Sequence, residues 1–86
     1  MDAMNFGEAL NAVKSGKRIA RSGWNGKGMF LFLVESWAFD DGNYHDHLKP
    51  EYNGHPFIAM KTADDRLVPW LASQTDILAD DWSVLA

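Results

Sequence analysis

The sequence predicts one small α+β domain: a small antiparallel sheet with an N-terminal helix and a short C-terminal helix, assembled as an oligomer. A segment with helical periodicity comes first, short apolar or alternating segments follow, and a second helix start lies near the C-terminus. The chain has 86 residues, of which 47% are hydrophobic and four are tryptophan. Because so short a chain buries only about 60–65% of its unfolded surface, we expect some apolar surface to be buried between subunits.

The N-terminal helix is predicted over residues 6–15. Asn5 and Glu8 have the spacing of a capping box, and Gly16 follows as a C-terminal stop. Apolar residues recur at helical intervals at Phe6, Ala9, Leu10 and Val13. One side of this helix is therefore expected to pack on the sheet.

Five strands are predicted. Alternating polar and apolar residues indicate strands over 17–21 and 82–85, and the apolar run 29–34 favours a central, largely buried strand. Residues 57–62 and 66–70 are predicted to form a hairpin around 63–65, with Pro69 at a strand end or edge because proline has no amide hydrogen to donate. Ser73 and Asp76 repeat the capping-box spacing and predict a short helix to about residue 80. Residues 35–56 combine turn formers with four aromatic residues, which indicates a folded flap or part of an interface.

Charge and composition exclude several classes of protein. The net charge is −4, with five basic against two acidic residues in 1–34 and three basic against ten acidic residues in 35–86. General DNA or RNA binding needs a broad basic face, so no nucleic-acid partner is expected, although a local basic loop can hold one or two phosphates. The absence of cysteine excludes disulfides and thiolate metal sites.

The sequence also predicts a cytoplasmic protein without a membrane partner. Its first residues lack the basic stretch and apolar run of a signal peptide. Its longest apolar run, 29–34, is far shorter than the roughly 20 residues that span a bilayer.

Two segments, 21–28 and 68–76, are the strongest candidates for a ligand site. Each places a tryptophan, Trp24 or Trp70, beside small, amide or hydroxyl residues, and the first also has three glycines in six residues. An indole offers a flat face to a planar ring, and glycines let backbone N–H groups approach a ligand. Flanking cations and short polar side chains can meet phosphate and ribose oxygens. This combination suits a nucleotide-like ligand; the alternatives are a tight turn whose tryptophan fills the core and a simple helix cap at Ser73.

Signals for catalysis are weak. His45 and His47, with nearby aspartates and His55, have some of the character of a metal site, but a solvated polar loop is the simpler interpretation. The carboxylate pairs at 64–65 and 80–81 are typical of a turn and a helix end, not of an acid and a base that converge on a substrate. The sequence therefore predicts neither an enzyme nor a bound cofactor or metal.

Three stretches, MNFGEAL at 4–10, ARSGWNGKGM at 20–29 and the segment 60–82 that includes VPWLASQTDILADDW, resemble the Thoeris anti-defence two family of small phage and prophage proteins. The resemblance runs over residues 4–84, except for 36–56. It implies one cyclic-nucleotide-binding domain over 1–86 that acts in the bacterial host cytoplasm. It also implies a non-enzymatic sponge, which binds cyclic ADP-ribose isomers made by TIR-domain immune enzymes and holds them intact, so that the defence effector is not activated. Homotetramers with ligand pockets at subunit interfaces are implied as well, and some relatives take cyclic dinucleotides or trinucleotides.

The chemistry and location of the side chains suggest a role for each candidate. Trp24 and Trp70 would contact the adenine or ribose rings. The polar contacts to ribose or base edges would come from Asn25, Ser73 and Gln74. Asp76 would accept from a ribose diol, and Arg21 and Lys27 would face the pyrophosphate, although the acid-rich half of a neighbouring subunit is an alternative partner for Arg21. The rival hypotheses are a structural or regulatory phage subunit with a tryptophan-rich protein-binding surface, and a metal-dependent phosphodiesterase that uses His45 and His47.

Overall fold

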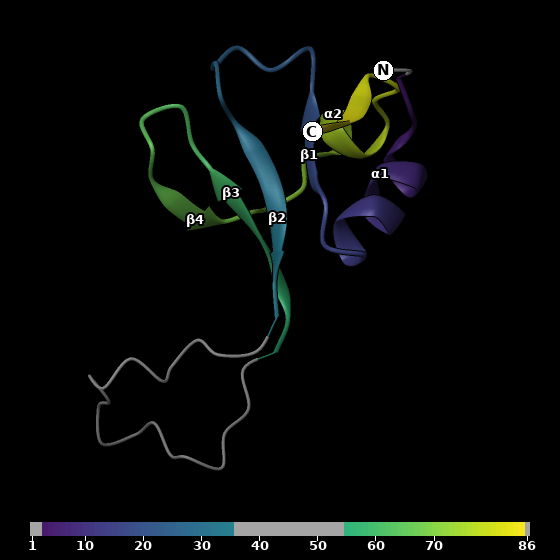
Figure 1. The fold of residues 1–86 in the computed structure, drawn as a ribbon. Coiled ribbons are helices and arrows are strands. Elements are labelled where there is room, and N and C mark those ends of the chain that lie inside the picture. Colours follow the sequence, from purple (N-terminus) through teal and green to yellow (C-terminus); the bar gives the residue numbers. More distant parts are fainter. Residues whose placement is uncertain (1–2, 36–54, 86) are drawn as a thin grey trace, which may run out of the picture.

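The computed structural model describes residues 3–35 and 55–85 and shows an α+β fold (Figure 1). Its helices are α1 (Phe6–Lys14) and α2 (Gln74–Ile77). Its strands are β1 (Arg18–Arg21), β2 (Phe30–Val34), β3 (Phe57–Lys61), β4 (Leu67–Pro69) and β5 (Trp82–Leu85). The five strands form one antiparallel sheet in the order β4-β3-β2-β1-β5. The predicted fold class, with its two helices and antiparallel sheet, is confirmed.

The predicted elements are found within a few residues of their expected bounds. The capping box of α1 is present: the Asn5 side chain accepts from the Glu8 amide at 2.8 Å, and the Glu8 side chain accepts from the Asn5 amide at 3.1 Å. Helix α2, in contrast, ends at Ile77 and not near residue 80. Its cap is one-sided, because Ser73 accepts from the Asp76 amide while the Asp76 side chain bonds elsewhere.

The core lies between α1 and one face of the sheet. Ala9 and Val13 on α1 are fully buried, together with Ile19 on β1, Leu31 on β2 and Trp82 on β5. The pairing register places Ile19 opposite both Leu31 and Val84, so these residues share one face, as strand alternation requires. Figure 1 shows α1 and α2 on the same side of the sheet.

The opposite face of the sheet has no helix of the described residues on it. Strand β2 is central, as predicted, but only Leu31 is fully buried; Phe32 and Val34, which point to the other face, are half-buried. The prediction of a largely buried central strand is therefore wrong for its second face. Among residues 3–35 and 55–85, α1 is the single long helix, and it covers this strand on one side only.

Three further features complete the fold. The predicted β3–β4 hairpin is present and closes with Asp65 at a positive φ of 64° and a hydrogen bond from the Thr62 amide to the Arg66 carbonyl at 2.8 Å. Met4 lies beside β5, where it exchanges backbone hydrogen bonds with Trp82. No helix within 3–35 and 55–85 has the length and apolar character needed to cross a membrane.

Candidate functional site

Three tryptophans from distant parts of the chain meet beside the core. Trp82 is fully buried, and the rings of Trp24 and Trp70 pack edge-on against it. Their centroids lie 5.4 Å and 6.1 Å from that of Trp82, with interplanar angles of 82° and 85°. Both outer indoles keep part of their surface exposed. The two tryptophans that the sequence singled out thus share one neighbour, and each retains surface that a planar ligand can contact. We call these three residues the tryptophan cluster.

The strand register explains why these segments meet. Arg21, the last residue of β1, pairs with Trp82, the first residue of β5, so the glycine-rich loop 22–29 begins beside Trp82. At the other end of the sheet, Pro69 ends β4, and the Trp70 amide donates to the Ile58 carbonyl at 2.9 Å. The chain then leads from Trp70 into α2, which returns it to β5.

One arginine and two aspartates form a charged group at the edge of the tryptophan cluster. Arg21 Nε donates to Asp81 Oδ1 at 2.7 Å, and Arg21 Nη1 donates to Asp76 Oδ1 at 2.8 Å. The Arg21 side chain is only 15% exposed. Its guanidinium is thus already bonded to carboxylates of its own chain, and the charged group as a whole carries a formal charge of −1. We call Arg21, Asp76 and Asp81 the charged clamp.

The charged clamp also holds the loop and the indoles. Trp24 Nε1 donates to Asp76 Oδ1 at 3.1 Å, and Trp82 Nε1 donates to the Asp76 carbonyl at 2.9 Å. Asp81 Oδ2 accepts from the Gly23 amide at 2.7 Å and from Ser22 Oγ at 3.2 Å. A Cβ at Gly23 would lie 2.8 Å from Asp81 Oδ2, so a side chain at this position would displace the Asp81 carboxylate.

These contacts shift the pKa values of all three charged groups. Hydrogen bonds to Asp81 and Asp76 raise the pKa of Arg21. The hydrogen bond from Arg21 lowers the pKa of Asp81, and the Gly23 amide adds to that effect. Burial opposes ionisation of Asp76, yet the bonds from Arg21 and Trp24 outweigh it and lower its pKa. Both aspartates are therefore carboxylates at neutral pH.

The far end of the loop is fixed to the β3–β4 hairpin. Lys61 Nζ donates to the Gly28 carbonyl at 3.0 Å and pairs with Asp65 at 2.7 Å. Gly28 has a positive φ of 75°, and a Cβ at Gly26 would lie 2.9 Å from the Ala63 Cβ. The glycines thus allow the loop to lie close against the hairpin, a role that differs from the predicted approach of backbone N–H groups to a ligand.

The remaining predicted residues lie at the solvent side of these segments. Asn25 and Lys27 are exposed on the glycine-rich loop, and Gln74 is exposed at the start of α2. Ser73 is exposed and caps α2. The structure therefore gathers Arg21, Trp24, Trp70 and Asp76 near Trp82, while Asn25, Lys27, Ser73 and Gln74 are exposed on the adjoining segments.

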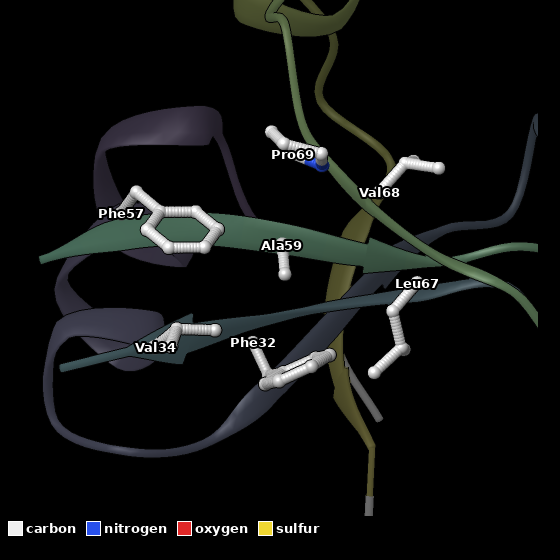
Figure 2. A pocket seen from close by; sticks show the side chains of 7 residues that line it. All are labelled: Phe32, Val34, Phe57, Ala59, Leu67, Val68 and Pro69. Atoms are coloured by element: carbon white, nitrogen blue, oxygen red, sulfur yellow. The ribbon is translucent and has the colours of Figure 1, made fainter. Parts of the chain in front are cut away.

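A separate hollow of about 360 Å³ lies on the opposite face of the sheet (Figure 2). Figure 2 shows its side chains in front of β2 and β3, with α1 behind the strands. Its lining consists of Phe32, Val34, Phe57, Ala59, Leu67, Val68 and Pro69. None of these side chains has a polar atom to recognise a ribose, base or phosphate. Although the hollow is well formed, its chemistry suits an apolar contact and not a nucleotide. We call it the open-face hollow.

The described residues show no arrangement typical of a catalytic metal. Within 3–35 and 55–85, no three His, Asp or Glu side chains are placed to hold a metal ion. The predicted alternative that uses His45 and His47 lies outside the described residues. The one described histidine of that set, His55, is exposed, and its ring Nδ1 lies 2.7 Å from the Pro56 carbonyl.

Two important residues were missed in the sequence. Asp81 looked like the end of a helix, but it binds Arg21 and the Gly23 amide across about sixty residues of chain. Trp82 looked like a strand residue, but it is the centre of the tryptophan cluster. The one available signal was that Asp81 immediately precedes, and Trp82 begins, an alternating segment expected to pair in the sheet.

Comparisons with known proteins show the family to which this chain belongs. The chain matches the Tad2-like family, described as the Thoeris anti-defense 2-like domain, over residues 4–85. It is also 45% identical over 89 aligned residues to the protein named Thoeris anti-defense 2 from Bacillus phage SP01, with 96% of each chain covered. The chain belongs to this anti-defence family.

Proposed function

We propose that this protein binds a cyclic ADP-ribose-type immune second messenger and holds it without cleavage, which keeps the messenger from the defence effector. The proposal also includes cyclic oligonucleotides as related ligands of this protein. Membership of the anti-defence family supports the biological role. The observation that carries the proposal is the pair of partly exposed indoles, Trp24 and Trp70, held against Trp82 and bordered by polar side chains.

The aromatic part of the site supplies affinity. Stacking of a base on an aromatic side chain contributes about 1–3 kcal/mol, and nanomolar binding requires about −12 kcal/mol in total. Two indole contacts, several hydrogen bonds and exclusion of water are together of the right size. Sequestration needs only such binding, with no proton transfer and no nucleophile.

The polar part of the site supplies recognition. Lys27 is exposed and is assigned to the pyrophosphate, while Asn25, Ser73 and Gln74 are assigned to ribose hydroxyls or base edges. Asp76 is assigned to a ribose diol through Oδ2, because Oδ1 already accepts from Arg21 and Trp24.

We further propose that the protein is a homo-oligomer, with a tetramer as the expected form, in the cytoplasm of the bacterial host. The open-face hollow supports this assembly, because apolar side chains such as Leu67, which is 66% exposed, gain stability when a second copy covers them. The same hollow favours the alternative function, a phage structural or regulatory subunit that binds another protein.

One capture experiment separates these functions. The protein is incubated with cyclic ADP-ribose isomers and cyclic dinucleotides and recovered by filtration. After denaturation, the released compounds are identified by mass spectrometry. Sequestration predicts release of an intact cyclic nucleotide in stoichiometric amount. A linear or hydrolysed product that disappears with a chelator would establish a metal-dependent phosphodiesterase, and capture of no nucleotide by a folded protein would favour the protein-binding alternative.

A further inference from the structure

We infer that Arg21 and Asp81 are positioning residues for Trp24: they hold its indole in a ligand-ready orientation and do not themselves contact the ligand. The expected effect of these residues on ligand affinity rests on the proposed function. Its geometric basis is independent of any ligand, because every contact involved lies within the charged clamp, the adjoining loop and the tryptophan cluster.

The bonds of Arg21 favour a positioning role over a role in phosphate binding. Two guanidinium nitrogens donate at 2.7 Å and 2.8 Å to two different carboxylates, and the side chain is 15% exposed. A phosphate would have to replace a carboxylate on Arg21 and would then meet the two aspartates at close range. Since the charged clamp carries a formal charge of −1, an approaching anion is repelled there. Lys27 lies exposed on the same loop, outside the charged clamp, and is the better candidate for the phosphate contact.

Asp81 fixes the backbone that carries Trp24. Its Oδ1 accepts from Arg21, and its Oδ2 accepts from the Gly23 amide at 2.7 Å. Gly23 directly precedes Trp24, so this bond sets the direction in which the chain enters residue 24. The hydrogen bond from the Trp24 amide to the Arg21 carbonyl at 3.3 Å closes the same turn.

Asp76 fixes the ring of Trp24. Its Oδ1 accepts from the Trp24 indole N–H at 3.1 Å and from Arg21 at 2.8 Å. The T-shaped contact with Trp82 holds a second side of the same indole. Arg21 thus joins the carboxylate that holds the ring to the carboxylate that holds the backbone. A preorganised indole loses less conformational entropy when a ligand stacks on it, which raises affinity.

The test compares Asp81→Asn with Asp80→Asn. Both substitutions remove one negative charge from neighbouring positions, but Asp80 is exposed and lies outside the charged clamp. The loss of one negative charge alone would strengthen binding of an anionic nucleotide, so weaker binding cannot come from net charge. Each variant is examined by ¹H–¹⁵N NMR of the tryptophan indole N–H groups, assigned by single Trp→Phe variants, and by calorimetric titration with cyclic ADP-ribose and with cyclic di-GMP.

We expect the Trp24 indole signal to shift in Asp81→Asn and to stay in place in Asp80→Asn. Affinity for the nucleotide that binds the wild-type protein is expected to fall about tenfold in Asp81→Asn, a change typical of the loss of a charge-assisted hydrogen bond. In a Trp24→Ala background, the same Asp81→Asn substitution is expected to change affinity by less than about twofold, because a positioning residue acts through the side chain that it positions.

Several results would overturn the inference. An unchanged Trp24 signal with weaker binding would show that Asp81 contacts the ligand directly, and so would additive effects of Asp81→Asn and Trp24→Ala. If Asp81→Asn does not fold, Gly23→Ala serves instead, since its Cβ would displace the Asp81 carboxylate without any change of charge. If the wild-type protein binds neither nucleotide, the proposed function fails, and the Trp24 signal alone decides whether the charged clamp positions that ring.

Discussion

The tryptophan cluster and the open-face hollow lie on opposite faces of one sheet and differ in kind. At the tryptophan cluster, two partly exposed indoles stand beside carboxylates, a guanidinium and a glycine-rich loop. The open-face hollow is a concavity of about 360 Å³ that is lined only by carbon-rich side chains. A nucleotide needs aromatic faces and hydrogen-bonding groups in one place, and only the first region offers both. We therefore place the proposed nucleotide site at the tryptophan cluster.

The difference also follows from how the chain covers its sheet. Helix α1 covers the first face, so Ile19, Leu31 and Trp82 are fully buried there. The second face is covered by no described element, so Leu67 and its neighbours remain exposed. The first face is covered by α1 within one chain. Within 3–35 and 55–85, the second face leaves apolar side chains that contact with a further surface would stabilise.

The largest expected effect is on stability, and it distinguishes Trp82, a core residue of the tryptophan cluster, from Trp24, a proposed ligand contact. Trp82→Ala removes a fully buried indole from the core and should lower the free energy of unfolding by about 3–5 kcal/mol. Trp24→Ala, at a partly exposed position, should cost clearly less. Urea denaturation of the two variants measures both values. Equal losses would mean that Trp24 is as much a core residue as Trp82.

Loss of either outer indole tests which face binds the nucleotide. Trp24→Ala and Trp70→Ala should each weaken binding of the captured nucleotide by about 1–3 kcal/mol, or roughly 5- to 150-fold. Val34→Ala, in the open-face hollow, is the matched control. It should leave the affinity for the nucleotide, measured per binding site, unchanged. Calorimetric titration gives the values. A loss with Val34→Ala and none with Trp24→Ala would reverse the assignment of the two faces.

A charge placed in the open-face hollow tests its role in assembly. Leu67→Asp puts a carboxylate on an apolar contact surface, and we expect sedimentation velocity to show a shift to smaller species. Leu71→Asp is the control, because Leu71 is 91% exposed and lies outside the hollow. If Leu71→Asp dissociates the protein while Leu67→Asp does not, the subunit contact lies beside α2 and not at the open face.

The smallest expected effect is a pH dependence of stability from the charged clamp. The pKa values of Asp76 and Asp81 are lowered in the folded protein, so the unfolded chain binds more protons than the folded one. Their contribution is therefore complete above the unfolded pKa of about 4 and is lost as the pH falls through the folded values.

Urea midpoints measured between neutral pH and pH 2 check this sign. The wild-type protein should lose stability more steeply below about pH 4 than a variant with both Asp76→Asn and Asp81→Asn. Asp80→Asn should follow the wild-type curve. Parallel curves for all three proteins would show that the charged clamp does not contribute to the pH dependence of stability.

Local patterns were sufficient to predict most of the fold. The capping box at Asn5 and Glu8, the alternation over 82–85 and the hairpin around residues 63–65 are properties of neighbouring residues, and each is confirmed. The bounds of α2 were predicted less well, because the Asp76 side chain bonds Arg21 and Trp24 and does not complete a capping box.

The sequence indicated Arg21, Trp24, Trp70 and Asp76 as members of the candidate site, but it did not indicate how the charged residues pair. Trp24 and Trp70 stood out beside glycine and polar residues, and the structure brings both to Trp82. The pairing of Arg21 with Asp81 depends on the register of β1 with β5, which no local pattern reveals. A free cation and a paired one look the same in a sequence, and only the partner decides between a phosphate contact and a structural role.

The most direct test of the account is a map of the bound nucleotide by NMR, with the nucleotide recovered in the capture experiment as the titrant. We predict that the indole signals of Trp24 and Trp70 shift and saturate together, while the methyl signals of Val34 and Leu67 in the open-face hollow change little beyond any effect of assembly. Shifts centred on those methyl groups, with both indole signals unmoved, would contradict the central claim that the tryptophan cluster holds the ligand.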